Sequence, residues 1–170
     1  VLLFYYLIPN KFRLGKNIVL LAFSLAFYFY GEPRMIILML ISIFVNYVSG
    51  ILIHSEKKRG LKKAYLIVSI VINVLLLGYY KYFNFFSENL AKLFGIDSIV
   101  TKILLPIGIS FYTFQGLSYV IDVYRNDAPV QKNPINIALY ISLFPQLIAG
   151  PIVRYNTVSE EIGTRKENGI

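Results

Sequence analysis

The residues that could do chemistry lie in the stretch 105–155. If a helix begins near residue 107, its small and polar residues follow one another at intervals of four, three, four and three, so they share one face. They are Gly108, Tyr112, Gln115, Tyr119 and Asp122. In apolar surroundings nothing but protein or water can satisfy the hydrogen bonds of such a face. We therefore expect it to point at other helices or into a water-filled cavity.

A proline interrupts the second apolar segment of this stretch. Pro145 removes a backbone donor and strains the preceding turn, so a straight helix over 134–155 is not expected. We predict a kinked or re-entrant segment near 145–155, with Gln146 and Arg154 as its polar residues. Irregular backbone at membrane depth is tolerated only where protein or water covers it.

The composition indicates a membrane protein. Hydrophobic residues make up 56% of the 170 residues, charged residues make up 15%, and the mean hydropathy is +0.61. A soluble domain of this size is less apolar. The chain has no cysteine, so it offers no disulfide, thiolate nucleophile or cysteine metal site. Its sequence also contains no nucleotide-binding loop, paired-carboxylate site, metal-ligand cluster or nucleophile elbow.

We expect one all-α, polytopic transmembrane domain over residues 1–170. The chain begins without methionine and ends in a polar run, so we expect an N-terminal fragment of a longer protein, truncated at both ends. The predicted spans are a partial one at 1–8 and full ones at about 17–31, 35–53, 64–80, 103–124 and 134–153.

The basic residues predict the orientation of these spans. The loops 10–16 and 54–63 contain three and five Lys or Arg residues, whereas the connection 31–34 contains one. The positive-inside rule places both basic loops in the cytoplasm and 31–34 outside. The net charge of +8 then reflects topology, and no nucleic-acid partner is expected.

Polar spacing recurs in the span 35–53. Ser42, Asn46, Gly50 and His54 follow one another every four residues, a strip that would let a neighbouring helix approach closely and form hydrogen bonds. His54 is the only histidine, and it falls at the mouth of a basic loop. We expect it to be solvated rather than catalytic.

Two further patterns involve aromatic and charged residues. The aromatic-rich run 79–95 predicts an aromatic belt followed by a helix lying in the membrane interface, and stacking on nucleic acid is the less favoured alternative. Asp122 and Arg125 are three residues apart on one helical face, so they could form an ion pair. The alternative is that Asp122 lines a reaction chamber.

The segments 104–125 (LLPIGISFYTFQGLSYVIDVYR) and 143–155 (LFPQLIAGPIVRY) carry a resemblance to a known family. They resemble segments of membrane-bound O-acyltransferases, closest to the alginate O-acetyltransferase branch. Upstream, 27–34 (FYFYGEPR), 41–53 (ISIFVNYVSGILI) and 80–90 (YKYFNFFSENL) are similar to the same branch in the same order. The resemblance therefore covers nearly the whole chain.

The resemblance implies a multi-pass enzyme of the bacterial cytoplasmic membrane. Such an enzyme would move acetyl groups from cytoplasmic acetyl-coenzyme A across the membrane to a cell-surface polysaccharide, with an extracytoplasmic partner transferase. Membrane lipid is expected around it, and no bound cofactor. The family's catalytic histidine lies C-terminal to this chain, so the chain alone is expected to be inactive and to supply chamber-lining residues. These are Tyr112, Gln115, Tyr119, Asp122, Gln146 and Arg154.

Two other functions remain open. A sister branch of the family transfers D-alanine to teichoic acid, although GISFYTFQ and PQLIAGPIVRY are more similar to the acetyl branch. A transporter or channel without catalysis would also suit a kinked helix with a polar stripe. A histidine in an apolar segment beyond this chain would favour the enzyme.

The predicted orientation can be tested by labelling in intact cells. Arg13→Cys and Lys58→Cys should be shielded from a membrane-impermeant maleimide, whereas Pro33→Cys should react, because the basic loops are expected in the cytoplasm. Labelling of Lys58→Cys before permeabilisation would overturn this orientation.

Overall fold

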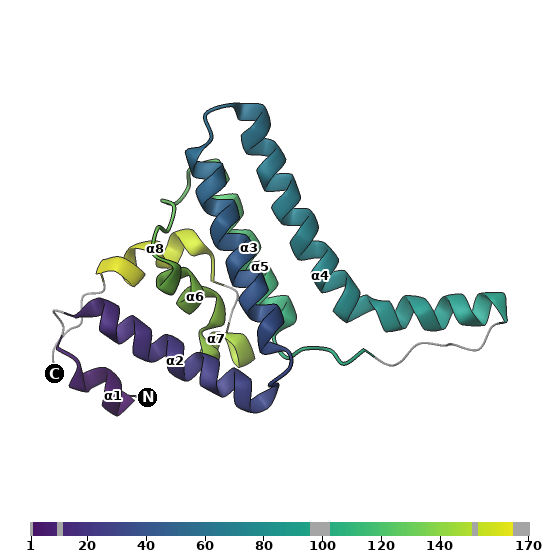
Figure 1. Ribbon diagram of the computed structural model, residues 1–170, viewed down its shortest axis with the longest axis horizontal. Helices are drawn as coiled ribbons and strands as arrows, with labels where there is room; N and C mark the ends of the chain where they lie inside the picture. The colour runs from purple at the N-terminus through teal and green to yellow at the C-terminus, as the bar shows by residue number, and fades with distance from the viewer. Residues whose placement is uncertain (1, 10–11, 96–102, 151–152, 165–170) are drawn as a thin grey trace.

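The computed structural model describes residues 2–9, 12–95, 103–150 and 153–164, and within these ranges it contains helices but no strand (Figure 1). The all-α fold is therefore confirmed. The helices are α1 Leu2–Leu7, α2 Arg13–Gly31, α3 Ile36–Ser55, α4 Arg59–Phe94, α5 Ile109–Arg125, α6 Pro134–Ser142, α7 Phe144–Ala149 and α8 Tyr155–Thr164.

The long helices have the character of membrane spans. Among the described residues three helices, α2, α3 and α4, are long and apolar enough to cross a bilayer. Large apolar side chains on these helices remain exposed, for example Phe44 at 67% and Leu75 at 66%. In a soluble protein such a surface would be buried, so lipid is its natural environment. The chain is a membrane protein.

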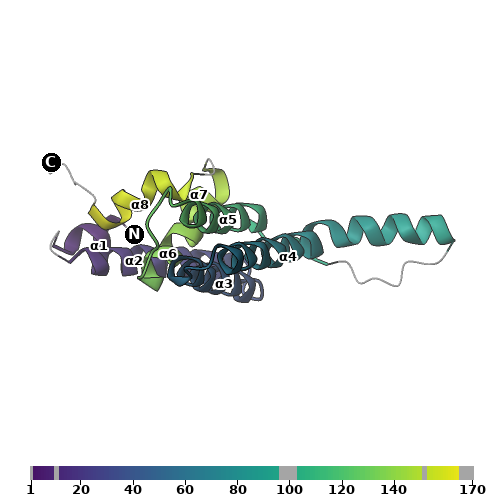
Figure 2. The same ribbon diagram turned by 90° about the horizontal axis from the view of Figure 1, so that it is seen from above.

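The helices form a bundle with one protruding element. α3 and α5 lie side by side, and the first part of α4 packs against both (Figure 1). α2 crosses at a steep angle to α3 and packs on α6 and α7, while α8 lies against α5. The last part of α4 bends away from the direction of its first part (Figure 1), and it extends beyond the other helices (Figure 2).

Small residues allow α3 and α5 to approach closely. A Cβ added to Gly50 on α3 would overlap the Tyr119 ring of α5, and a Cβ added to Gly116 on α5 would overlap the Asn46 side chain of α3. Each glycine thus makes room for a large side chain of the opposite helix. The predicted strip is confirmed, since Ser42 and Asn46 are buried with Gly50, whereas His54 is exposed as expected.

A pair of amides joins α3 to α4 under Gly116. The Asn46 amide donates to Asn73 Oδ1 at 3.1 Å, and the Asn73 amide donates back to Asn46 Oδ1 at 3.0 Å. Both side chains are at most 1% exposed. Because each amide also donates to a carbonyl one turn earlier in its own helix, at Ser42 and Ser69, their N–H groups are satisfied without water.

Side-chain contacts mark two ends of the bundle. At one end the Ile107 N–H donates to Glu32, which follows α2, at 2.9 Å. At the other end Lys62 at the start of α4 donates to Asn126, which follows α5, at 3.3 Å. The start of α5 therefore lies beside the α2–α3 connection, and its end lies beside the start of α4.

Two predicted spans have different boundaries in the structure. The span predicted at 64–80 is only part of α4, which continues through the aromatic run to Phe94 and ends at Gly95 with φ +64°. The span predicted at 103–124 begins late, because α5 starts only at Ile109 after Pro106 and after Gly108 with φ +71°. A proline disfavours helical conformation in the preceding residue, and the left-handed Gly108 breaks helical geometry again.

The span predicted at 134–153 is not one helix. α6 ends at Ser142, Leu143 has φ −58° and ψ 111°, and the short α7 follows. Pro145 occupies the first turn of α7, where its missing N–H costs nothing. As predicted, the described residues of 134–155 do not form one straight helix, but the break between α6 and α7 lies at Leu143, before Pro145. Residues 151–152 of the predicted segment 145–155 lie outside the described residues.

The contact between Gly116 and Asn46 predicts a stability effect. Gly116→Ala should destabilise the purified protein by about 1–3 kcal/mol, because the added methyl group must displace the Asn46–Asn73 pair. Gly78→Ala in α4 is the matched control, since nothing lies within 4 Å of its added Cβ. Thermal unfolding in detergent measures both variants. Equal melting temperatures for the two would contradict the close packing of α3 on α5.

Candidate functional site

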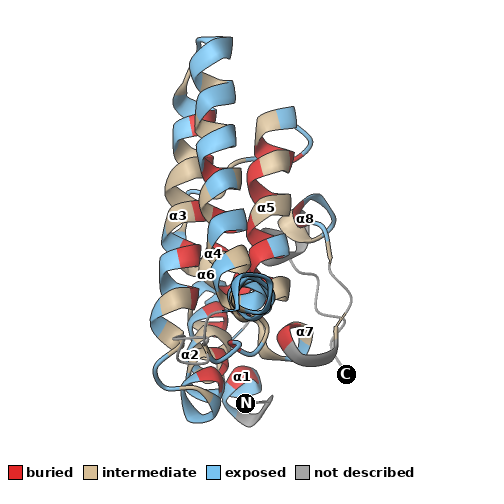
Figure 3. Ribbon diagram, turned by 90° about the vertical axis from the view of Figure 1, so that its right-hand side faces the viewer, coloured by how far each residue is buried: buried red, intermediate tan, exposed pale blue. Residues whose placement is uncertain are grey.

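The predicted polar face of α5 is buried. Tyr112, Gln115, Tyr119 and Asp122 are between 0% and 6% exposed. The buried residues of α5 lie on the side that faces the other helices, whereas the residues in the outer part of α4 are mostly exposed (Figure 3). The helical spacing that predicted one shared face is therefore confirmed. The role of these residues as chamber lining remains a prediction.

Near its N-terminal end, α5 meets a tyrosine of α2. Tyr112 and Tyr28 are 2% and 4% exposed, and their hydroxyl groups lie near each other. Neither hydroxyl has a hydrogen bond of standard geometry within the described residues. Sequence reasoning did not identify Tyr28. The run FYFYGEPR contains several aromatic residues, and the sequence does not show which of their rings faces the bundle.

In the middle of the face, Gln115 contacts Gln146 of α7. The Gln115 side-chain amide donates to Gln146 Oε1 at 3.3 Å, so the two glutamines predicted as lining residues lie together. Gln115 Oε1 is buried and has no partner among the described residues. A buried acceptor without a hydrogen bond is costly.

The break at Leu143 is what brings α7 to this place. The Phe144 N–H donates to Ser24 of α2 at 3.4 Å, which holds the start of α7 against that helix. At the other side, Leu147 packs on Gly108, where an added Cβ would lie 2.7 Å from Leu147 Cγ. The absence of a side chain at Gly108 thus lets α7 lie against the start of α5.

Three tyrosine rings close the next part of the face. The Tyr155 ring packs edge-on against Tyr119 at 4.8 Å between centroids and against Tyr140 at 5.3 Å. The Tyr140 hydroxyl donates to the Val153 carbonyl at 2.8 Å. Such T-shaped contacts are favourable beyond the area they bury, so this cluster fixes the chain where α8 begins.

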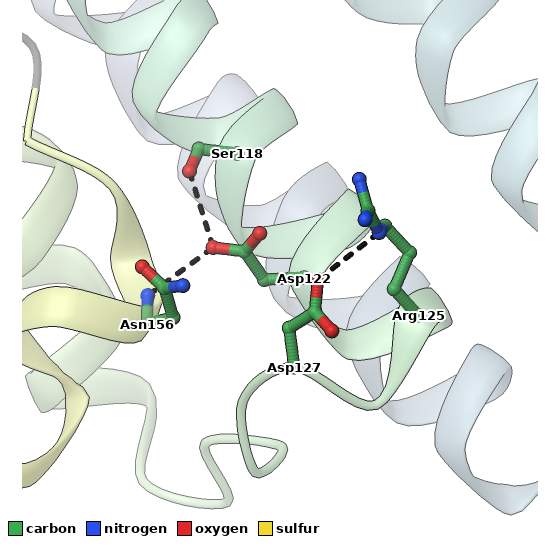
Figure 4. A network of polar contacts seen from close by, with 5 residues as sticks. All are labelled: Ser118, Asp122, Arg125, Asp127 and Asn156. Carbon is green, nitrogen blue, oxygen red and sulfur yellow. Dashed lines mark hydrogen bonds and ion pairs between the residues drawn. The ribbon is translucent and has the colours of Figure 1, made fainter.

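Asp122 holds the N-terminus of α8 (Figure 4). Its Oδ2 accepts from the Ser118 hydroxyl at 3.3 Å and from the Asn156 N–H at 3.1 Å. Ser118 Oγ in turn accepts from the Tyr155 N–H at 3.2 Å. The first N–H groups of a helix have no partner within that helix, and here two side chains of α5 supply the acceptors.

The structure contradicts one prediction for the charged residues and leaves another untested. The ion pair between Asp122 and Arg125 is wrong, because Arg125 Nε pairs with Asp127 at 3.0 Å and the Asp122 carboxylate points to α8 instead (Figure 4). Arg154 is exposed, so the structure does not bring it into the buried cluster. Its predicted role stays a prediction. Ser118 was missed, although it lies one turn before Asp122 and could have been paired with it.

The buried face offers hydrogen-bond donors rather than a base. The hydroxyls of Tyr28 and Tyr112 and the amides of Gln115 and Gln146 could bind a carbonyl oxygen or an alcohol. His54 is exposed at the end of α3 and is not part of this cluster. Among the described residues no three His, Asp or Glu side chains group as metal ligands would.

Known proteins are similar to this chain over nearly its full length. The chain is 37% identical over 166 residues to a probable alginate O-acetylase of Azotobacter vinelandii and 39% identical over 166 residues to one of Pseudomonas aeruginosa. Each match includes 95% of this chain, but only 33% and 31% of the relative. The chain therefore spans about a third of the length of the curated relatives it matches.

A relative with a different named substrate is also similar. A peptidoglycan O-acetyltransferase of Helicobacter pylori is 32% identical over 157 residues, which include 78% of this chain and 30% of the relative. No protein-family model and no solved structure matches the chain.

The hydrogen bonds that Asp122 accepts predict which substitutions at this position are tolerated. Asp122→Ala should destabilise the protein by about 1–3 kcal/mol, because the Asn156 N–H and the Ser118 hydroxyl lose their acceptor. Asp122→Asn keeps an acceptor oxygen and should recover most of this loss. Asp127→Ala, an exposed carboxylate, should change stability by less than about 0.5 kcal/mol. Thermal unfolding in detergent separates the three, and equal losses for Ala and Asn at 122 would contradict the capping role.

Proposed function

Because the chain belongs to the membrane-bound O-acyltransferase family, we propose that it forms part of an enzyme that O-acetylates a cell-surface polysaccharide. The names of its relatives, alginate O-acetylase and peptidoglycan O-acetyltransferase, support acetyl transfer to a cell-surface glycan. They favour this function over D-alanyl transfer and over transport without catalysis.

One structural observation supports a chamber beside α5. The hydroxyls of Tyr28, Tyr112 and Tyr119 and Oε1 of Gln115 are buried without a partner among the described residues. Buried polar groups in proteins are nearly always hydrogen-bonded, and those that are not call for water, a ligand or a function. These four groups come from α2 and from one face of α5. We take them as the place where a substrate or water completes the hydrogen bonding.

The reaction needs groups that this chain supplies and a group that it does not. Transfer of an acetyl group from a thioester to a hydroxyl requires a general base and donors for the oxyanion of the tetrahedral intermediate. The phenol of Tyr112 and the amides of Gln115 and Gln146 are suitable donors to a carbonyl oxygen or to the substrate's hydroxyl. The base is expected to be a histidine outside this chain.

The proposed location of the enzyme rests on the predicted orientation of the two ends of the bundle. The α5 face connects the end at Glu32, predicted to lie outside, with the end at Lys62, predicted to lie in the cytoplasm. We propose a multi-pass protein of the cytoplasmic membrane that takes acetyl groups from acetyl-coenzyme A on the inner side. On the outer side it would hand them on with the help of an extracytoplasmic partner transferase.

Comparing two neighbouring substitutions tests this proposal. In the complete protein, Gln115→Leu should lower acetylation of the surface glycan at least about tenfold, equivalent to about 1.4 kcal/mol of activation barrier, while abundance and melting temperature stay unchanged. Phe114→Leu is the matched control, because Phe114 lies about 100° away around the helix. It is 44% exposed.

The opposite outcomes return Gln115 to a packing role. If Gln115 only joins α5 to α7, its replacement should cost about 0.6–2 kcal/mol of stability, the range for a hydrogen bond between membrane helices. A Gln115→Leu protein that fails to accumulate, or equal activity losses for the two variants, would therefore exclude a chamber at this position.

A further inference from the structure

The outer part of α4, residues 79–94, is amphipathic and packs little on the bundle; we call it the arm. One side of the arm carries large apolar residues that are between 37% and 77% exposed. They follow one another at intervals of three, one, three, four and three residues, so they form one stripe. They are Tyr79, Tyr82, Phe83, Phe86, Leu90 and Leu93.

The stripe of the arm continues the lipid-facing surface of the membrane span. Earlier on α4, Val68, Val71 and Leu75 are 55%, 48% and 66% exposed. They precede Tyr79 at intervals of three, four and four residues, so they lie on the same side of the helix. The side of α4 that would face hydrocarbon within the bilayer is therefore the side that becomes rich in aromatic residues in the arm.

The opposite side of the arm carries its charged residues, together with the exposed Phe85. Lys81, Glu88 and Lys92 are all exposed there, about 180–220° around the helix from Tyr79. A helix buried inside a protein would have to remove these charges from water, which is costly. A helix lying at a membrane surface keeps them in water, where a lysine can reach lipid phosphate groups.

From this surface we infer that the arm lies in the phospholipid interface of the membrane, with its aromatic stripe among the acyl chains and its lysines toward the headgroups. The bend in α4 agrees with this position, because the arm leaves the direction of the span and extends away from the bundle (Figures 1 and 2). The predicted orientation of the spans assigns it to the outer leaflet.

The arm also holds the segment that leads into α5. The Asn84 side chain donates to the Ile103 carbonyl at 2.7 Å and accepts from the Ile103 N–H at 3.0 Å. Lys81 Nζ lies 3.4 Å from the Ser110 hydroxyl in the first turn of α5. A lipid contact that fixes the depth of the arm would therefore also fix the depth at which α5 begins.

Spin labels on the two sides of the arm test this inference. The sequence has no cysteine, so single cysteines can be placed at Phe86→Cys on the stripe and at Glu88→Cys on the charged side once any cysteine elsewhere in the complete protein is replaced. The probe is a vesicle of phosphatidylcholine and phosphatidylglycerol. Val68→Cys in the span serves as a reference for contact with acyl chains.

The readout is collision of each label with oxygen, which concentrates in lipid, and with a nickel chelate, which stays in water. We expect the oxygen-to-nickel ratio at 86 to exceed that at 88 by at least about threefold and to approach that at 68. Exclusion of both reagents at 86, with an immobilised label, would show that protein covers the stripe. Equal ratios at 86 and 88 would place the arm in water. Either of these results would overturn the inference.

Discussion

The bundle depends on satisfying amide hydrogen bonds without water. Asn46 and Asn73 do this for α3 and α4 by bonding to each other and to carbonyls of their own helices. α5 packs against this pair at Gly116, where the absence of a side chain is required because an added Cβ would overlap Asn46. Helices in lipid gain little from hydrophobic association, so one such polar junction between three helices has a large influence on their register. The position of the α5 face follows from it.

Along that face the polar groups divide into two kinds. Toward the C-terminal end of α5, Ser118 and Asp122 have partners, and those partners are the first N–H groups of α8. Tyr112, Gln115 and Tyr119 of the same face keep buried oxygens without partners among the described residues. The first kind stabilises the fold. The second leaves a cost of about 1–3 kcal/mol for each group unless something else binds there, and these groups are the reason for proposing a chamber along this face.

The sequence predicted those features that depend on local periodicity. The shared face of α5 follows from intervals of three and four residues, and the close approach of α3 follows from Gly50 and its neighbours. Features set by distant contacts were not predictable in this way. The partner of Asp122 is a backbone group 34 residues away, and Tyr28 meets Tyr112 from another helix. Both required knowing how α2, α5 and α8 are placed in space.

The break between α6 and α7 shows how a local irregularity can serve the site. In a continuous helix over 134–149, α7 would follow the direction of α6. The turn at Leu143 changes the direction of the chain, and Gln146 contacts Gln115. The cost of the break is limited, since Ser24 accepts from the first N–H of α7 and Pro145 has no N–H to satisfy. A backbone irregularity whose own hydrogen bonds are supplied by neighbours is stable within a membrane. The turn at Leu143 therefore brings the half-buried Gln146 side chain to Gln115 without leaving the first backbone amide of α7 unsatisfied.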